Sequence, residues 1–302
     1  MLRYLPKLLG IKEQTLFFNT VTRTKYSICA MGEAKLDSKG IPLSSIIGAI
    51  QSFADTSLAA SWDNVGLLIE PTEPIPIKHI LLTNDLTENV IQEAVDLQVG
   101  LVISYHPPIF APLKSVTTRT WKERIVARCL ENKISLYSPH TSFDSIRGGV
   151  NDWLASAFDL ENSNPIEPGT KPENGMGRIC QLKNPISVMQ AVELVKRHTG
   201  LSHVRLARAV HQNGDLVKTV ALCAGSGSSV LKNVSADLYL TGEMLHHDVL
   251  DAVHNNVNVI LTNHSDSERG FLKHFADKLL DILETPIKIS VSKADEDPLK
   301  TV

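Results

Sequence analysis

The alternation of short apolar segments with amphipathic ones constrains this chain more than any other feature. Residues 79–83, 100–104 and 257–262 are mostly apolar, have the length of buried strands and run into polar residues. Hydrophobic side chains in 43–58 and 86–98 recur at helical spacing. Strands separated by helices of about 12 residues form right-handed crossovers and mainly parallel sheets. The sequence therefore predicts an α/β fold.

Local signals predict where several helices begin. Thr120 with Glu123 forms a capping box, and Ser265 with Glu268 forms another at the start of a long predicted helix. Pro185 suits the first position of a further helix. A short apolar segment at 287–291 is the predicted final strand.

The first 31 residues differ from the rest in composition. They carry five basic side chains against one acidic side chain, so the remaining chain has a net charge near −7, although the whole chain has −3. Such a leader is typical of an organelle transit peptide and equally of an N-terminus without a fold of its own, with Met31 as an alternative start. We expect it to lie outside the fold, and a mitochondrial location follows only if it is a transit peptide.

Charge, hydropathy and cysteine spacing exclude several classes of protein. A net charge of −3 argues against direct nucleic-acid binding. No apolar run approaches the roughly 18 residues of a membrane span. The four cysteines form no C-x-x-C pair, which indicates neither a disulfide framework nor a zinc ribbon. These features favour a reducing compartment such as the cytoplasm and no membrane association; a nuclear location is implied only by the family resemblance described below.

A segment rich in Asn, Pro and Gly, residues 161–177, has the composition of a linker. It predicts an N-terminal α/β half over 40–160 and a C-terminal α/β half over 178–302.

Two strand–helix–strand units resemble each other in their polar ends. Asp85 precedes His106 by 21 residues, and Glu243 precedes His264 by the same number. Units of similar length also recur by chance, so internal duplication is a hypothesis at this point. If it holds, both histidines follow the carboxyl ends of strands, where open α/β sheets bind ligands.

Histidine and carboxylate side chains gather at predicted strand ends and helix starts. The groups are Tyr105 with His106, His140 with Asp144, Glu243 with His247, and His264 with Glu268. Imidazole nitrogens and carboxylate oxygens without thiolates suit zinc, manganese, iron or cobalt in a catalytic site. Each residue also has an ordinary structural interpretation, and Glu268 in particular fits the predicted capping box.

A glycine-rich segment follows a predicted strand and precedes a short helical stretch. Its residues Gly225, Ser226, Gly227 and Ser228 are candidates for holding an anion on backbone amides. A tight structural turn is the alternative interpretation.

Seven motifs in this sequence resemble those of the Ngg-one-interacting-factor-three-like family, whose bacterial members are labelled type-two homologues of GTP cyclohydrolase I. In chain order they are Ser61–Ile69, Ser104–Phe110, Ser138–Asp144, Gly148–Asp152, Gly225–Ser229, Leu240–Glu243 and His264–Gly270. The resemblance spans roughly residues 40 to 300, and the motif Ser104–Phe110 is similar to that of animal members. It implies two interlinked, duplicated three-layer α/β/α halves with mainly parallel sheets around a metal-binding cleft. It also implies a homo-oligomer, a dimer or a hexamer.

The resemblance implies metal ligands at His106, Asp144, His264 and Glu268. Tyr105 stands where the family has a further histidine, and a phenol with a pKa near 10 is a poorer ligand than imidazole. One or two divalent ions per chain, zinc, iron or manganese, are therefore expected, with any second ion held weakly. The acid–base or supporting candidates are Asp85, His140, Glu243 and His247.

Two classes of function are compatible with this reading. A metal at these residues would activate water, which predicts a metal-dependent hydrolase acting on a small-molecule substrate of unknown identity. The alternative is an adaptor or transcriptional co-regulator that acts through transcription-regulatory protein partners and whose metal site is structural or vestigial. The departure at Tyr105 is consistent with this alternative.

Overall fold

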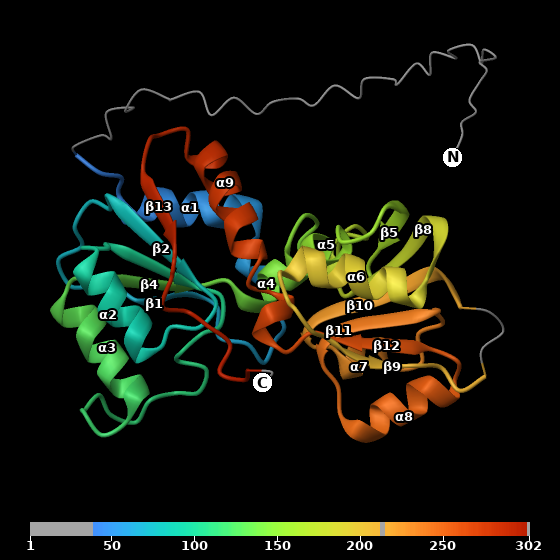
Figure 1. Ribbon diagram of the computed structural model, residues 1–302. Coiled ribbons are helices and arrows are strands. Elements are labelled where there is room, and N and C mark those ends of the chain that lie inside the picture. The colour runs from blue at the N-terminus through green and yellow to red at the C-terminus, as the bar shows by residue number, and fades with distance from the viewer. Residues whose placement is uncertain (1–38, 212–214, 301–302) are drawn as a thin grey trace, which may run out of the picture. The chain divides into compact units, whose positions relative to one another are not determined.

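Two β-sheets form around the predicted apolar segments (Figure 1). The structure is a computed structural model that describes residues 39–211 and 215–300, all within one compact unit of the chain. The predicted basic leader lies outside these residues. Among the residues that are described, no helix combines the length and hydropathy that crossing a bilayer would require.

The first sheet has five strands in the order β1-β4-β3-β2-β13. Their bounds are β1 (Gly66–Ile69), β2 (His79–Thr83), β3 (Leu101–Ser104), β4 (Ser135–Ser138) and β13 (Lys288–Val291). All neighbours pair in parallel except β1 with β4. The whole of β2 and β3 is buried, as expected for parallel strands covered on both faces.

Helices cover both faces of this sheet. The helices are α1 (Leu43–Phe53) and α9 (Phe271–Leu283) on one face, and α2 (Glu88–Asp96) and α3 (Trp121–Glu131) on the other. Successive side chains of a strand point to opposite faces, so Ile80 and Leu82 pack with α1 and α9, whereas Leu81 packs with α2 and α3. The first half is therefore a three-layer α/β/α structure.

The second sheet has six strands in the order β5-β8-β10-β11-β12-β9. Their bounds are β5 (Leu160–Asn164), β8 (Arg178–Ser187), β9 (Arg205–Ala207), β10 (Leu216–Ser226), β11 (Leu238–Glu243) and β12 (Asn258–Leu261). The central strands β10, β11 and β12 are parallel, and the flanking strands pair antiparallel.

The second sheet is also covered on both faces. One face carries α5 (Val150–Ala155) and α6 (Val188–Thr199), and the other carries α7 (Ser228–Leu231) and α8 (His246–His254). The remaining elements are α4 (His140–Ser145), the 3-10 turns Thr56–Leu58 and Ser265–Ser267, and the small pair β6 (Glu167–Pro168) with β7 (Gly175–Met176). The predicted α/β fold with duplicated three-layer halves is thus confirmed.

The halves share the chain differently from the sequence prediction. The helix α9 packs on the first sheet and β13 pairs with β2, so the C-terminal segment returns to the first half. The predicted linker is also not free of structure, because β5 within it pairs with β8 at the edge of the second sheet. An edge strand with mostly exposed side chains needs no apolar pattern, and the linker-like composition hid it.

Two of the three predicted helix starts were wrong. The capping box of Thr120 with Glu123 is present at the start of α3. In contrast, residues 265–267 form a 3-10 turn, and α9 begins only after Gly270. The segment around Pro185 belongs to β8, and α6 begins later behind a capping box made by Ser187 and Gln190.

A buried arginine joins the segment after α4 to the start of β8. Arg178 is 1% exposed, and both of its terminal nitrogens and Nε donate hydrogen bonds. Nε and one terminal nitrogen bind the two carboxylate oxygens of Asp152 at 2.8 and 2.9 Å. The carbonyl oxygens of Gly175, Gly177 and Ile146 accept the other three bonds.

We expect Arg178→Met to lower the free energy of unfolding by about 3 kcal/mol, because it leaves three carbonyl groups without this donor and leaves Asp152 with the Gly148 amide but without its cationic partner. Urea denaturation measures this change. Arg208→Met is the matched control, since Arg208 pairs with Asp215 at an exposed position and its loss should cost less than about 1 kcal/mol. Equal effects of the two substitutions would contradict the assigned role of Arg178.

Candidate metal centre

Polar side chains from the ends of four strands meet at one place. Asp85 follows β2 and His106 follows β3 in the first half, while Glu243 ends β11 and His264 follows β12 in the second half. The carboxyl ends of parallel strands carry the loops that bind ligands in α/β folds. The rings of His106 and His264 are 5.2 Å apart between centroids, so both halves contribute to one site.

Each of these histidines is held by a carboxylate in the same way. His106 Nδ1 lies 2.9 Å from Asp85 Oδ1, and His264 Nδ1 lies 3.1 Å from Glu243 Oε2. The carboxylate accepts a hydrogen bond from Nδ1–H, so the other ring nitrogen, Nε2, is the one available for a metal. The equal spacing in the sequence therefore corresponds to equal contacts, as the duplication hypothesis requires.

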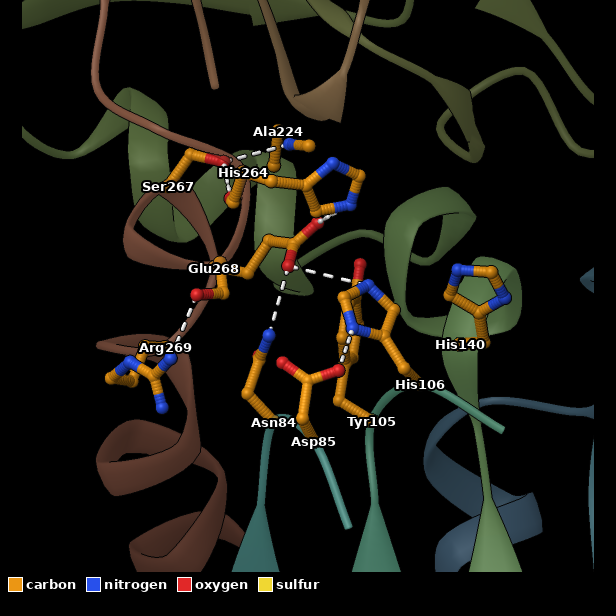
Figure 2. Close-up of polar contacts among 12 residues, drawn as sticks. Asn84, Asp85, Tyr105, His106, His140, Ala224, His264, Ser267, Glu268 and Arg269 are labelled. Carbon is orange, nitrogen blue, oxygen red and sulfur yellow. Dashed lines mark hydrogen bonds and ion pairs between the residues drawn. The ribbon is translucent and has the colours of Figure 1, made fainter. Parts of the chain in front are cut away.

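The Glu268 carboxylate lies between the two imidazole rings, as Figure 2 shows. It is 3% exposed, and its oxygens lie 3.4 Å from His106 Nε2 and 3.5 Å from His264 Nε2. Ligand atoms of these three residues lie within 4.8 Å of one another. His106, His264 and Glu268 thus form a group that could hold a metal ion.

Two different oxygens of Glu268 face the histidines. Oε2 lies 3.4 Å from His106 Nε2, and Oε1 lies 3.5 Å from His264 Nε2. Charge-assisted N–H···O bonds are about 2.7–2.9 Å long, so both contacts are longer than such bonds.

Asn84 and Gly225 shape the surroundings of Glu268. Asn84 is fully buried, and its side-chain amide donates a hydrogen bond of 3.1 Å to Glu268 Oε2. Gly225 has a φ of +66°, and a Cβ atom there would lie 2.5 Å from Glu268 Oε1 and 3.2 Å from His264 Nε2. Any side chain at this position would therefore intrude on the ligand group.

The glycine-rich segment uses its glycine amides internally. Gly225 N–H donates to Ser267 Oγ and Gly227 N–H donates to Thr241 Oγ1, at 2.7 and 3.0 Å. Ser226 is exposed, and Ser228 begins the four-residue helix α7. These contacts favour the tight-turn interpretation of this segment over the anion-binding one.

The carboxylates change the protonation of His106. Burial would lower the pKa of His106, but Glu268 and Asp85 outweigh burial and raise it to about 10. Burial would raise the pKa of Asp85, but the hydrogen bond from His106 lowers it overall. Without a metal, the proton on His106 thus compensates part of the buried negative charge, a role that a metal cation would also fill.

Tyr105 and Asp144 pair with each other beside this group. Both are buried, and the Tyr105 hydroxyl donates to Asp144 Oδ1 at 2.5 Å. Burial and the nearby carboxylates hold the pKa of Tyr105 well above its ordinary value, so the phenol is neutral. Burial also raises the pKa of Asp144 to about 6. Asp144 lies outside the group formed by His106, His264 and Glu268.

His140 belongs to a third histidine–carboxylate pair. It begins the helix α4, and its Nδ1 lies 2.8 Å from Asp63 Oδ1. Asp63 also accepts bonds from the backbone and hydroxyl of Thr141, which anchor its position. His140 has a φ of +30°, a strained value that costs a non-glycine residue about 1–3 kcal/mol.

A pocket of about 450 Å³ opens over the site. The polar residues that line it include Asp85, His106, His140, Glu243, His264 and Asp297. The sequence candidates Asp85, His140 and Glu243 are thus brought to the site, whereas His247 is exposed on α8 and does not line the pocket.

Sequence reasoning missed the roles of Asp63 and Asn84. Asp63 lies within the quoted motif Ser61–Ile69, but its partner His140 is 77 residues away, so only the fold reveals the pair. Asn84 directly precedes Asp85 at the end of β2, and this adjacency was the available signal.

Comparisons with known proteins agree with this architecture. The chain is 51% identical over 266 residues to a Drosophila melanogaster protein named NIF3-like protein 1, an alignment that covers 87% of this chain and 90% of the relative. It is 39% identical over 272 residues to a Saccharomyces cerevisiae protein named NGG1-interacting factor 3, covering 82% and 91%.

A solved structure described as a Bacillus cereus protein related to NIF3 has the same fold. Its TM-score is 0.77 at 23% sequence identity, and the match covers 87% of this chain and all of that one. The family model described as Duf34/NIF3 (NGG1p interacting factor 3) matches residues 41–298. The chain therefore belongs to the Duf34/NIF3 family.

Proposed function

We propose that this protein binds one divalent metal ion through His106, His264 and Glu268 and uses it for hydrolysis. The observation that carries this proposal is the convergence of two carboxylate-held imidazoles on one buried carboxylate. A bound divalent ion lowers the pKa of water toward neutrality and polarises a carbonyl or phosphoryl oxygen. Zinc, iron and manganese all accept this nitrogen and oxygen ligand set.

The residues of the chain have distinct tasks in this proposal. Asp85 and Glu243 hold the Nδ1 proton of His106 and His264 and so direct Nε2 toward Glu268. Asn84 holds the Glu268 carboxylate in place through its amide.

His140 is the proposed proton-transfer residue. It lines the pocket, and its Nδ1 donates to the Asp63 carboxylate, so Nε2 is the nitrogen that can take or give a proton at the substrate. Burial would raise the pKa of Asp63, but its bonds with His140 and Thr141 lower it overall, which keeps this carboxylate ionised beside His140.

Tyr105 supports a stoichiometry of one ion per chain. The family resemblance places a histidine ligand at this position, whereas the Tyr105 hydroxyl donates to Asp144. A neutral phenol and a carboxylate that accepts its hydrogen bond pair with each other instead of with a second ion. In this proposal Asp144 is therefore the hydrogen-bond acceptor that positions Tyr105 and is not a metal ligand.

An adaptor function is the second candidate. The yeast relative is named for an interaction with NGG1, and an adaptor would need the metal only for stability. The predicted homo-oligomer and the predicted compartments are compatible with both candidate functions, and they stay predictions.

Loss of a proposed ligand should abolish metal binding. The purified protein is expected to hold about one equivalent of zinc, iron or manganese, and His106→Ala, His264→Ala and Glu268→Gln should fall to near zero. Elemental analysis after dialysis at micromolar metal measures the content. His254→Ala, which changes an exposed histidine on α8, is the control and should keep full metal content. Wild-type protein without stoichiometric metal under these conditions would sink the proposal.

The orienting carboxylates should tune metal affinity without being ligands. Asp85→Asn and Glu243→Gln are each expected to weaken metal binding about 10- to 100-fold. The neutral amide that replaces the carboxylate is a weaker acceptor for the hydrogen bond from Nδ1–H. Competition with a chromophoric chelator measures the dissociation constant. Asp251→Asn on α8 is a control for the loss of one negative charge away from the site. An unchanged constant in both site variants would show that the two carboxylates do not orient the histidines.

Turnover and partner binding separate the two candidate functions. The hydrolase proposal predicts that metal-loaded wild type hydrolyses members of a panel of esters, cyclic amides and phosphoesters, and that His264→Ala and His140→Ala lose at least about 100-fold in kcat. The adaptor alternative predicts no turnover and equal affinity of wild type and His264→Ala for the NGG1 counterpart. Both quantities are measured on the same preparations.

A further inference from the structure

The pocket over the metal group has an apolar side as well as a polar one. Besides its polar residues, it is lined by Pro107, Phe110, Pro298 and Leu299. Phe110 and Leu299 are 48% and 65% exposed, so they offer apolar surface that no other described residue covers. A pocket of about 450 Å³ is within the usual range for a small organic ligand.

Two exposed aromatic rings stand next to each other at this apolar side. Trp62 is 61% exposed, and its ring lies 6.0 Å from that of Phe110 and 6.1 Å from that of His140. Leaving large rings in water forgoes the free energy of their burial, so such a pair is typical of a binding surface.

The two rings are carried by anchored loops. The Asn64 amide donates a hydrogen bond of 2.5 Å to the carbonyl oxygen of Ile109, which ties the loop of Trp62 to the loop of Phe110. Asp63, between Trp62 and Asn64, is bound to His140 and Thr141. The rings are thus held in place before any ligand arrives, which reduces the entropic cost of binding.

The charge of the pocket restricts the ligand further. No lysine or arginine is among the described residues that line it, whereas Asp85, Glu243 and Asp297 are. The nearby Arg269 is paired with Asp295 at 2.5 Å. Together with Glu268, these three carboxylates exceed the charge of one divalent ion. Beside a bound divalent ion, a phosphate group would therefore meet these four carboxylates and no lysine or arginine among the described lining residues.

The C-terminal segment supplies one of the carboxylates that line the pocket, and its position is fixed by hydrogen bonds. Asp297 is 8% exposed, and its carboxylate accepts bonds from Ser265 Oγ at 2.7 Å and from the Leu299 amide at 2.8 Å. These bonds place one negative charge and the apolar Pro298 and Leu299 on the same pocket.

We propose that this pocket binds a planar heteroaromatic ring in an uncharged or cationic compound, packed against the ring of Phe110 and the neighbouring ring of Trp62, which is tilted by 56° from it. The surrounding carboxylates disfavour compounds that carry a phosphate, so these compounds should bind more weakly than their uncharged counterparts. The inference rests on the proposed function in that the ring would belong to the substrate of the metal site.

The test uses full-length protein with its metal and calorimetric titration of four probes. Adenosine and quinoxaline are uncharged rings, adenosine monophosphate is a phosphorylated ring, and ribose phosphate has no ring. We expect both uncharged probes to bind, adenosine monophosphate to bind at least about 10-fold more weakly than adenosine, and ribose phosphate not to bind. Phe110→Ala and Trp62→Ala should each weaken adenosine binding about 5- to 100-fold, the usual range for a lost stacking partner.

Matched variants make the outcome specific. Trp121→Ala removes another exposed tryptophan, at the start of α3, and should leave adenosine binding unchanged. Asp297→Asn keeps an oxygen acceptor for the Leu299 amide but removes a negative charge. It should therefore reduce the ratio between the dissociation constants of adenosine monophosphate and adenosine.

Three results would overturn the inference: neither uncharged probe binds, their binding is unchanged in Phe110→Ala, or the monophosphate binds more tightly than adenosine. A change of oligomeric state in Trp62→Ala, seen by sedimentation, would instead assign the rings to an interface between copies and would also overturn it. The metal content of the same samples tests the proposed function separately. The Phe110→Ala and Trp62→Ala variants should retain the ion. Wild-type protein without the ion would contradict the proposed metal binding but not the binding of the ring.

Discussion

The burial of the Glu268 carboxylate is the constraint around which the site is organised. An ionised carboxylate that is 3% exposed costs several kcal/mol unless it is paired and hydrogen-bonded. Here the compensation comes from two imidazoles, one on each half, and from the Asn84 amide. The glycine at 225 leaves space for this arrangement, since a methyl group there would occupy the position beside the carboxylate.

Duplication of the halves accounts for the two histidine–carboxylate pairs at the strand ends but not for the other residues of the site. Each sheet supplies the same pair, a carboxylate at one strand end and a histidine at the next, and the two pairs face a common point. Glu268 has no such duplicate among the contacts described, and the pairs His140–Asp63 and Tyr105–Asp144 come only from the first half. The two histidines that face Glu268 therefore have matching carboxylate contacts in the two halves, while the other pairs of the site have no counterpart among the contacts of the described residues.

The sequence allowed a correct prediction of the buried strands and of the polar residues that follow them, whereas two of the three local helix-start signals were misleading. Apolar strands that end in His106 and His264 are visible because strand burial and strand ends leave a short-range signature. Glu268 was ambiguous because a helix start and a metal site both favour a carboxylate three residues after a serine. The structure contradicts the helix-start interpretation, since α9 begins later, and it shows that Glu268 faces the two histidines. The contact of Asp63 with His140 and the pairing of β13 with β2 join distant segments, which no local pattern encodes.

The return of the C-terminal segment to the first sheet has a consequence for how the protein is made. Until α9 and β13 leave the ribosome, a nascent first half lacks the partners of Ile46, Ile50 and Ile80 on one face of its sheet. Domains generally fold as units during synthesis, but this one cannot finish before nearly the whole chain has been translated. Since Glu268 is also supplied by this late part of the chain, a truncated product would have neither a closed core nor a complete ligand group. Completion of the fold and assembly of the site are thus a single event.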